Sequence, residues 1–186
     1  MAEITRLNDG SQEAPRLEIH QSWWAMAGLG EDGREWTIEE KFEEIAKAGF
    51  TGILGRLPSP EQSERWRRLL DEYDFKFGIH SFPFHRDDLE TIIREAQNFG
   101  VDYINSQVAD SFITDSKAVS LLRGLITAAS EAKIPYFIET HRGRITQDLL
   151  RTVQYVHDVP EIQLTIDLSH YVVAGEMFLP SDQVES

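Results

Sequence analysis

The chain repeats a strand-then-helix pattern roughly every 30 residues, which is the length of a βαβ unit. Apolar runs typical of strands lie at residues 16–23, 52–55, 75–82, 101–108, 134–139 and 162–168. Segments with helical periodicity follow the first five of these runs. Parallel strands need long crossover connections, which are usually helices. The repeat therefore predicts a parallel sheet with helices packed outside it.

Helix start signals support this division of the chain. Thr37 and Glu40 have the spacing of a capping box, and Ser59 and Gln62 have the same spacing with a proline at the first helical position. Thr146 is the expected N-cap of the fifth helix. The five helices are thus expected at residues 37–49, 59–73, 87–99, 116–132 and 146–156.

Two α/β architectures fit this order, an open doubly wound sheet and a (β/α) TIM barrel. The barrel is favoured because polar residues gather at the carboxyl ends of many strands, where a barrel brings them to one mouth. These residues are His20, Arg56, His80, Asn105, Glu139, Asp167 and His170. No glycine-rich phosphate fingerprint follows the first strand, which argues against a dinucleotide-binding fold.

A full barrel needs eight units, and the sequence supplies about six. Residues 180–182 are typical of the start of a sixth helix, and residues 1–15 are polar and aperiodic. The prediction is an incomplete TIM barrel over residues 16–186, preceded by a disordered leader over residues 1–15. An incomplete barrel has open strand edges, which favour association into homo-oligomers.

The composition narrows the classes of partner. The 186 residues carry a formal net charge of −14, which argues against broad contact with a nucleic-acid backbone. There is no cysteine, so disulfides and thiolate chemistry are excluded. No signal peptide or bilayer-length apolar run is visible. We expect a cytoplasmic protein with a small-molecule ligand, and no membrane or nucleic-acid partner.

Two carboxylates at strand ends are the strongest candidates for chemistry. Glu139 and Asp167 each close an apolar run, and neighbouring strand ends face the same part of a barrel mouth. Two like charges there need a cation between them, or one must hold a proton. A divalent metal is the expected neutraliser. The plainer interpretation of Glu139 is an ion pair with Arg142 or Arg144.

Several other residues could contact a substrate. His170 follows Asp167 by three residues, and His141 and Arg142 begin the loop after Glu139. His80 and His20 close the third and first predicted strands. Each of these side chains has an alternative as a hydrogen-bonded or solvated residue. Aromatic side chains at loop starts could form a wall against a sugar ring, although packing between strands and helices is their commoner role; they are Trp23, Trp24, Phe82 and Phe84.

Three motifs resemble the sugar phosphate isomerase/epimerase group of the xylose isomerase-like barrels. They are Tyr136-Phe-Ile-Glu-Thr-His, Leu164-Thr-Ile-Asp-Leu-Ser-His and Gly78-Ile-His-Ser. The resemblance implies that Glu139 is both a metal ligand and the proton-transferring base, that Asp167 is a second ligand, and that His170 contacts substrate or metal. It implies a divalent ion (Mn, Mg, Co or Zn) and a sugar or sugar-phosphate substrate. The group completes its site with a histidine and a glutamate from strands seven and eight.

Two alternatives stay open at this point. The chain could be a non-catalytic barrel fragment or a module completed by a partner, because the last two strands are not in the sequence. It also resembles the endonuclease IV type of DNA repair enzyme at Glu139, Asp167 and His170. That type should place a histidine at the end of the fourth strand, where this chain has Asn105.

Overall fold

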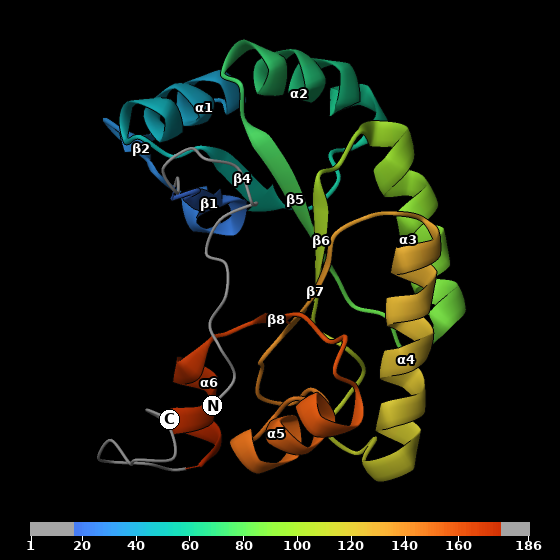
Figure 1. Cartoon of the computed structure of the whole chain (residues 1–186). Helices are drawn as coiled ribbons and strands as arrows, with labels where there is room; N and C mark the ends of the chain where they lie inside the picture. Colours follow the sequence, from blue (N-terminus) through green and yellow to red (C-terminus); the bar gives the residue numbers. More distant parts are fainter. Residues whose placement is uncertain (1–16, 176–186) are drawn as a thin grey trace.

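The computed structural model describes residues 17–175 and shows six parallel strands curled into part of a barrel (Figure 1). The strands are β1 (His20–Ser22), β4 (Gly52–Gly55), β5 (Lys76–Ser81), β6 (Tyr103–Ser106), β7 (Tyr136–Glu139) and β8 (Leu164–Thr165). They pair in chain order, β1-β4-β5-β6-β7-β8. This confirms the prediction of an incomplete (β/α) TIM barrel.

Helices connect consecutive strands and cover the convex face of the sheet (Figure 1). They are α1 (Ile38–Lys47), α2 (Pro60–Glu72), α3 (Arg86–Phe99), α4 (Asp115–Glu131) and α5 (Leu149–Asp158), followed by α6 (Leu168–Ala174) after β8. None of these helices has the length and apolar content needed to cross a lipid bilayer.

The two faces of the sheet differ because successive side chains of a strand point to opposite sides. On β5, Phe77 and Ile79 are almost fully buried, and Phe77 packs against Trp66 of α2 with ring centroids 5.4 Å apart. His80 alternates with them and faces the concave side. Gly78 also faces that side, and a Cβ there would lie 2.1 Å from the Tyr103 ring. His80 is thus on the inside of the curled sheet, whereas the apolar side chains of β5 face the helices.

The helix start signals were only partly right. The capping box of Thr37 and Glu40 is present at α1. At α2 the predicted box is absent, because Ser59 makes no side-chain capping hydrogen bond, although Pro60 does occupy the first turn. The N-cap of α5 is Asp148, whose side chain accepts a hydrogen bond from the Arg151 amide, so the assignment to Thr146 was wrong.

Other differences concern elements that the sequence pattern did not indicate. A short hairpin of β2 (Gly30–Glu31) and β3 (Arg34–Glu35) follows the 3-10 helix η1 (Trp23–Met26). The sixth strand is two residues long, and α6 begins at Leu168, which was placed in that strand. The predicted leader and the predicted helix start at residues 180–182 lie outside the described residues.

Candidate functional site

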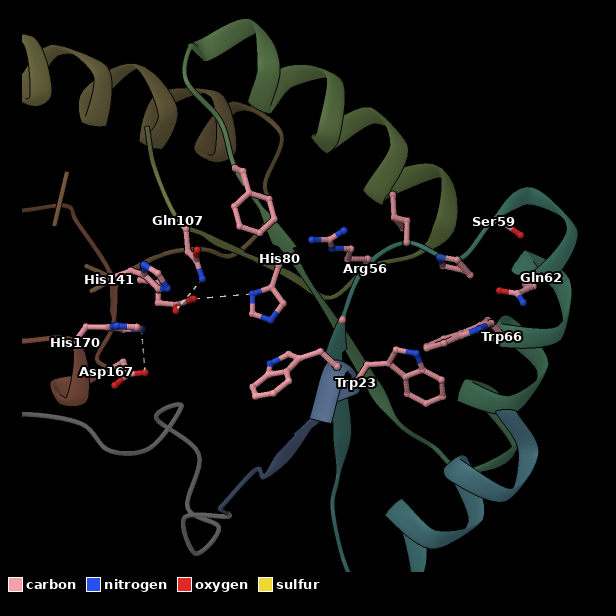
Figure 2. A pocket seen from close by; sticks show the side chains of 16 residues that line it. Trp23, Arg56, Ser59, Gln62, Trp66, His80, Gln107, His141, Asp167 and His170 are labelled. Carbon is pink, nitrogen blue, oxygen red and sulfur yellow. Dashed lines mark hydrogen bonds and ion pairs between the residues drawn. The ribbon is translucent and has the colours of Figure 1, made fainter. Parts of the chain in front are cut away.

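A cavity of about 670 Å³ opens at the carboxyl ends of the strands (Figure 2). Its lining comes from η1, the end of β4, β5, the segment after β6, β7 and the start of α6. Of the residues predicted from sequence, it brings together His80, Glu139, His141, Asp167 and His170. The volume lies in the range of small-molecule sites. The strand order therefore gathers the predicted residues as a barrel mouth does.

Glu139 is the buried carboxylate of this cavity, with 8% of its surface exposed. Two neutral amides hold it: Asn105 Nδ2 donates to Oε2 at 2.7 Å and Gln107 Nε2 donates to Oε1 at 3.1 Å. No arginine or lysine pairs with Glu139 among residues 17–175. The ion pair considered for this residue in the sequence is therefore not formed, and its negative charge is left uncompensated by a fixed cation.

Two histidines approach this carboxylate. Ligand-type atoms of Glu139, His141 and His170 all lie within 4.8 Å of one another. The His141 and His170 rings have centroids 3.8 Å apart. His141 Nδ1 lies 2.6 Å from the Arg142 carbonyl oxygen, and because a carbonyl can only accept, Nδ1 must carry the proton. The lone pair of His141 is then on Nε2, as a metal ligand requires.

The loop after β7 positions His141. Thr146 Oγ1 donates to the Glu139 carbonyl at 2.6 Å and accepts from the His141 amide at 3.2 Å. Thr146 is fully buried, so it fixes the turn from inside. Thr146, which was predicted to start a helix, instead holds the loop that places His141 next to Glu139 through these two hydrogen bonds.

His170 is positioned by the first turn of α6. Asp167 is the N-cap, and its Oδ1 accepts from the Ser169 amide at 2.9 Å and from the Ser169 hydroxyl at 2.5 Å. The Ser169 hydroxyl contributes most to lowering the Asp167 pKa. Asp167 Oδ2 lies 3.6 Å from His170 Nε2. Asp167 does not belong to the group formed by Glu139, His141 and His170, and its role as a metal ligand stays a prediction.

His80 and His170 are both shifted toward the neutral form. Burial lowers the pKa of His80, and nearby Arg56 lowers it further, while Glu139 opposes the shift. Burial also lowers the pKa of His170, with a contribution from His141. His80 Nδ1 is buried, and it lies 3.9 Å from Glu139 Oε2. It has no hydrogen-bond partner within the described part of the chain. Neutral imidazoles can bind a metal or accept a proton.

Two predicted residues lie elsewhere. His20 begins β1 instead of ending it, and its Nδ1 lies 2.8 Å from the Tyr103 hydroxyl in a second cavity near the amino ends of the strands. The placement of His20 at the mouth was wrong because the strand starts there. The Arg142 side chain is exposed and is not among the described residues that line the cavity.

Three of the four aromatic residues considered in the sequence line the cavity: Trp23, Trp24 and Phe82. Trp23 also packs against Trp66 with ring centroids 4.6 Å apart, so it combines both interpretations. Trp24 lines the cavity and keeps 75% of its surface exposed. The amide donors Asn105 and Gln107 were not identified as partners of Glu139, although their alternation on one strand places them on the same face.

Comparisons with solved structures show the same fold in several proteins. A probable 3-DHS dehydratase from Bacillus anthracis superposes with a TM-score of 0.64 at 14% identity, over 86% of this chain and 66% of that one. Endonuclease IV from Thermus thermophilus gives 0.51 at 18% identity, over 84% and 64%. A xylose isomerase-like TIM barrel protein from Mycobacterium smegmatis, in complex with magnesium, gives 0.53 at 14% identity, over 81% and 63%.

The chain thus spans about two thirds of the length of these structures. No curated protein sequence matches it significantly. The model of one protein family, described as xylose isomerase-like TIM barrel, matches residues 42–186. Together with the curled parallel sheet and its polar mouth, this match shows that the chain belongs to the xylose isomerase-like TIM barrel family.

Proposed function

We propose that the protein is a metal-dependent isomerase or epimerase of a sugar or sugar phosphate, with Glu139 as the proton-transferring base. The observation that carries the proposal is the clustering of ligand-type atoms of Glu139, His141 and His170 within 4.8 Å inside the mouth cavity. The M. smegmatis structure, which contains magnesium, supports a metal in this fold.

The three side chains fit a divalent cation chemically. One carboxylate and two imidazoles make a mixed oxygen and nitrogen donor set, which favours zinc, cobalt or manganese over magnesium. His141 presents a lone pair on Nε2, and the lowered pKa of His170 keeps its ring available near neutral pH. Asp167 would act on the site through His170, as a carboxylate that orients an imidazole ligand does.

A divalent ion held there would polarise a substrate carbonyl and so acidify the adjacent C–H bond. Glu139 would take that proton, since it reaches the cavity and its two carboxylate oxygens are oriented by Asn105 and Gln107. Return of the proton to the former carbonyl carbon, with transfer of the neighbouring hydroxyl proton to the former carbonyl oxygen, gives isomerisation. Epimerisation would instead need a second acid that delivers a proton to the opposite face of the carbon that lost it. The exposed ring of Trp24 offers a stacking surface for the sugar.

The first test is metal binding. Mn²⁺ and Zn²⁺ are titrated calorimetrically into the chain, into Glu139→Gln, and into Glu95→Gln, which changes an exposed glutamate on the outer helix α3. We expect Glu139→Gln to weaken binding at least tenfold and Glu95→Gln to leave it unchanged. Equal binding by all three proteins would remove the basis of the proposal.

The second test needs only one base and so suits a chain that spans two thirds of its structural relatives. The metal-loaded chain is incubated in D₂O with D-fructose or D-fructose 6-phosphate, and loss of the proton signals next to the carbonyl is followed by NMR. Exchange that depends on Glu139 is the expected result.

A small-molecule ligand and a cytoplasmic location are part of the same proposal.

A further inference from the structure

A cation lies in the same cavity, on the side away from the histidine cluster. Arg56 directly follows β4, and Figure 2 shows it between His80 and the α2 side of the cavity. Its guanidinium lies 5.7 Å from the centroid of the Phe82 ring. Within residues 17–175, no hydrogen bond or ion pair joins Arg56 to another side chain.

The chain carries 32 acidic and 18 basic side chains. Most other arginines of the described residues have a polar partner: Arg34 pairs with Glu40 at 2.6 Å and Arg86 pairs with Glu90 at 2.6 Å, whereas Arg123 donates to a backbone carbonyl. The two acidic residues that line the cavity have other partners: Glu139 is held by two amides, and Asp167 caps α6. The charge of Arg56 is therefore available to a ligand in the cavity.

Two arginines beside the Phe82 ring give this side of the cavity a positive character. The guanidinium of Arg144 lies 5.5 Å from the centroid of the same ring, so the ring contacts two cations. Arg144 is fastened by a hydrogen bond to the Ala109 carbonyl at 2.9 Å. The charge of Arg56 also acts on His80, whose proton affinity it lowers. Arg56 thus lies over an aromatic ring, while its hydrogen-bond donors have no partner within residues 17–175.

We propose that Arg56 anchors a carboxylate or phosphate group of the substrate, so that the ligand is an acidic sugar derivative. The carbonyl end of this ligand would lie near Glu139, His141 and His170. Its anionic end would lie near Arg56, on the other side of His80. Guanidinium is suited to both anions because its parallel N–H groups match two oxygens. This inference rests on the proposed function, since it assigns a substrate class to the same site.

The test uses simple anions in the absence of metal. Inorganic phosphate and D-gluconate are titrated into the chain, Arg56→Gln, Arg56→Lys and Arg94→Gln, with D-glucose as the neutral control ligand. Arg94 is exposed on α3, so its substitution changes the net charge equally but far from the cavity. Phosphate and gluconate are separate arms, and whichever binds more tightly identifies the anionic group.

We expect Arg56→Gln to weaken anion binding tenfold or more, Arg56→Lys to weaken it less, and Arg94→Gln to leave it unchanged. An equal loss in Arg94→Gln, no loss in Arg56→Gln, or no binding by the unsubstituted chain would overturn the inference. Circular dichroism confirms that the variants fold. Mn²⁺ binding by Arg56→Gln should match that of the unsubstituted chain, so failure here is distinguishable from failure of the metal site.

Discussion

The amide that holds Glu139 gives the most direct test of how this site is built. Asn105 is 1% exposed and donates to Glu139 Oε2 at 2.7 Å. Asn105→Ala removes this donor and leaves a buried carboxylate with one amide partner, Gln107. A hydrogen bond to a charged group contributes about 1.5–3 kcal/mol, so we expect a loss of about 2 kcal/mol. For a chain of this size, that lowers the melting temperature by roughly 4–8 °C.

The assay is a double-mutant cycle measured by urea denaturation. Asn105→Ala, Glu139→Ala and the double variant are compared, with Asn98→Ala on the exposed face of α3 as control. If the two side chains stabilise each other, the cost of Asn105→Ala shrinks by about 1–3 kcal/mol once Glu139 is absent. Additive losses would refute the reasoning, because they would mean that Asn105 contributes through packing alone.

Other parts of the fold give further predictions. Burial lowers the pKa of His20 from its ordinary value of 6.5, so the folded state binds fewer protons than the unfolded chain. The contribution of neutral His20 to the free energy of unfolding should be complete above about pH 6.5 and should decrease as the pH drops below it. Urea denaturation midpoints measured across this pH range should show the decrease, and His20→Gln should make the midpoint less dependent on pH. Gly78→Ala should destabilise by about 2 kcal/mol, because the new Cβ would overlap the Tyr103 ring. Gly124→Ala, inside α4 with its nearest neighbour at 3.9 Å, should be neutral or stabilising in the same denaturation assay. Thr146→Val should lower the unfolding free energy by about 1–3 kcal/mol, since it leaves a buried carbonyl without its donor. Sedimentation velocity should detect self-association through the strand edges of β1 and β8, each of which pairs on one side in the described residues; a strictly monomeric profile at high concentration would count against it.

The fold was predictable because its strands and helices repeat with different hydrophobic periods. Gly52–Gly55 was predicted with the bounds that the structure shows, and the capping box at Thr37 marked the start of α1. The end of the sheet was not predictable in the same way. Residues 164–168 alternate as a strand does, but Asp167 caps a helix, and this local preference outweighs the pattern. The Asp32-Gly33 pair of the β2–β3 hairpin was a turn signal that went unused.

The sequence indicated which residues of the candidate site lie together better than it indicated their arrangement, and their roles stay predictions. Glu139, His141 and His170 were all identified, yet the sequence paired Glu139 with Asp167. That pairing rests on strand neighbours alone. The actual arrangement depends on the turn held by Thr146 and on the first turn of α6, and neither follows from hydrophobic period. His20 was misplaced for a related reason, because a strand two or three residues long leaves little margin between its two ends.

The choice of donors around Glu139 explains how a buried carboxylate can remain open to a cation. A carboxylate offers about four lone-pair directions, and the amides of Asn105 and Gln107 use one on each oxygen. Both donors are neutral, so they reduce the cost of desolvation without cancelling the charge. An arginine in their place would satisfy the same oxygens and leave no attraction for a metal. The guanidinium that lines the cavity without a partner in the described part of the chain belongs to Arg56, directly after β4. Strand β4 lies three strands away from β7 and Glu139 in the sheet order. Because Glu139 and Arg56 are far apart, neither charge neutralises the other. This arrangement predicts a ligand that carries an anionic group at the Arg56 end and binds through a cation at the Glu139 end.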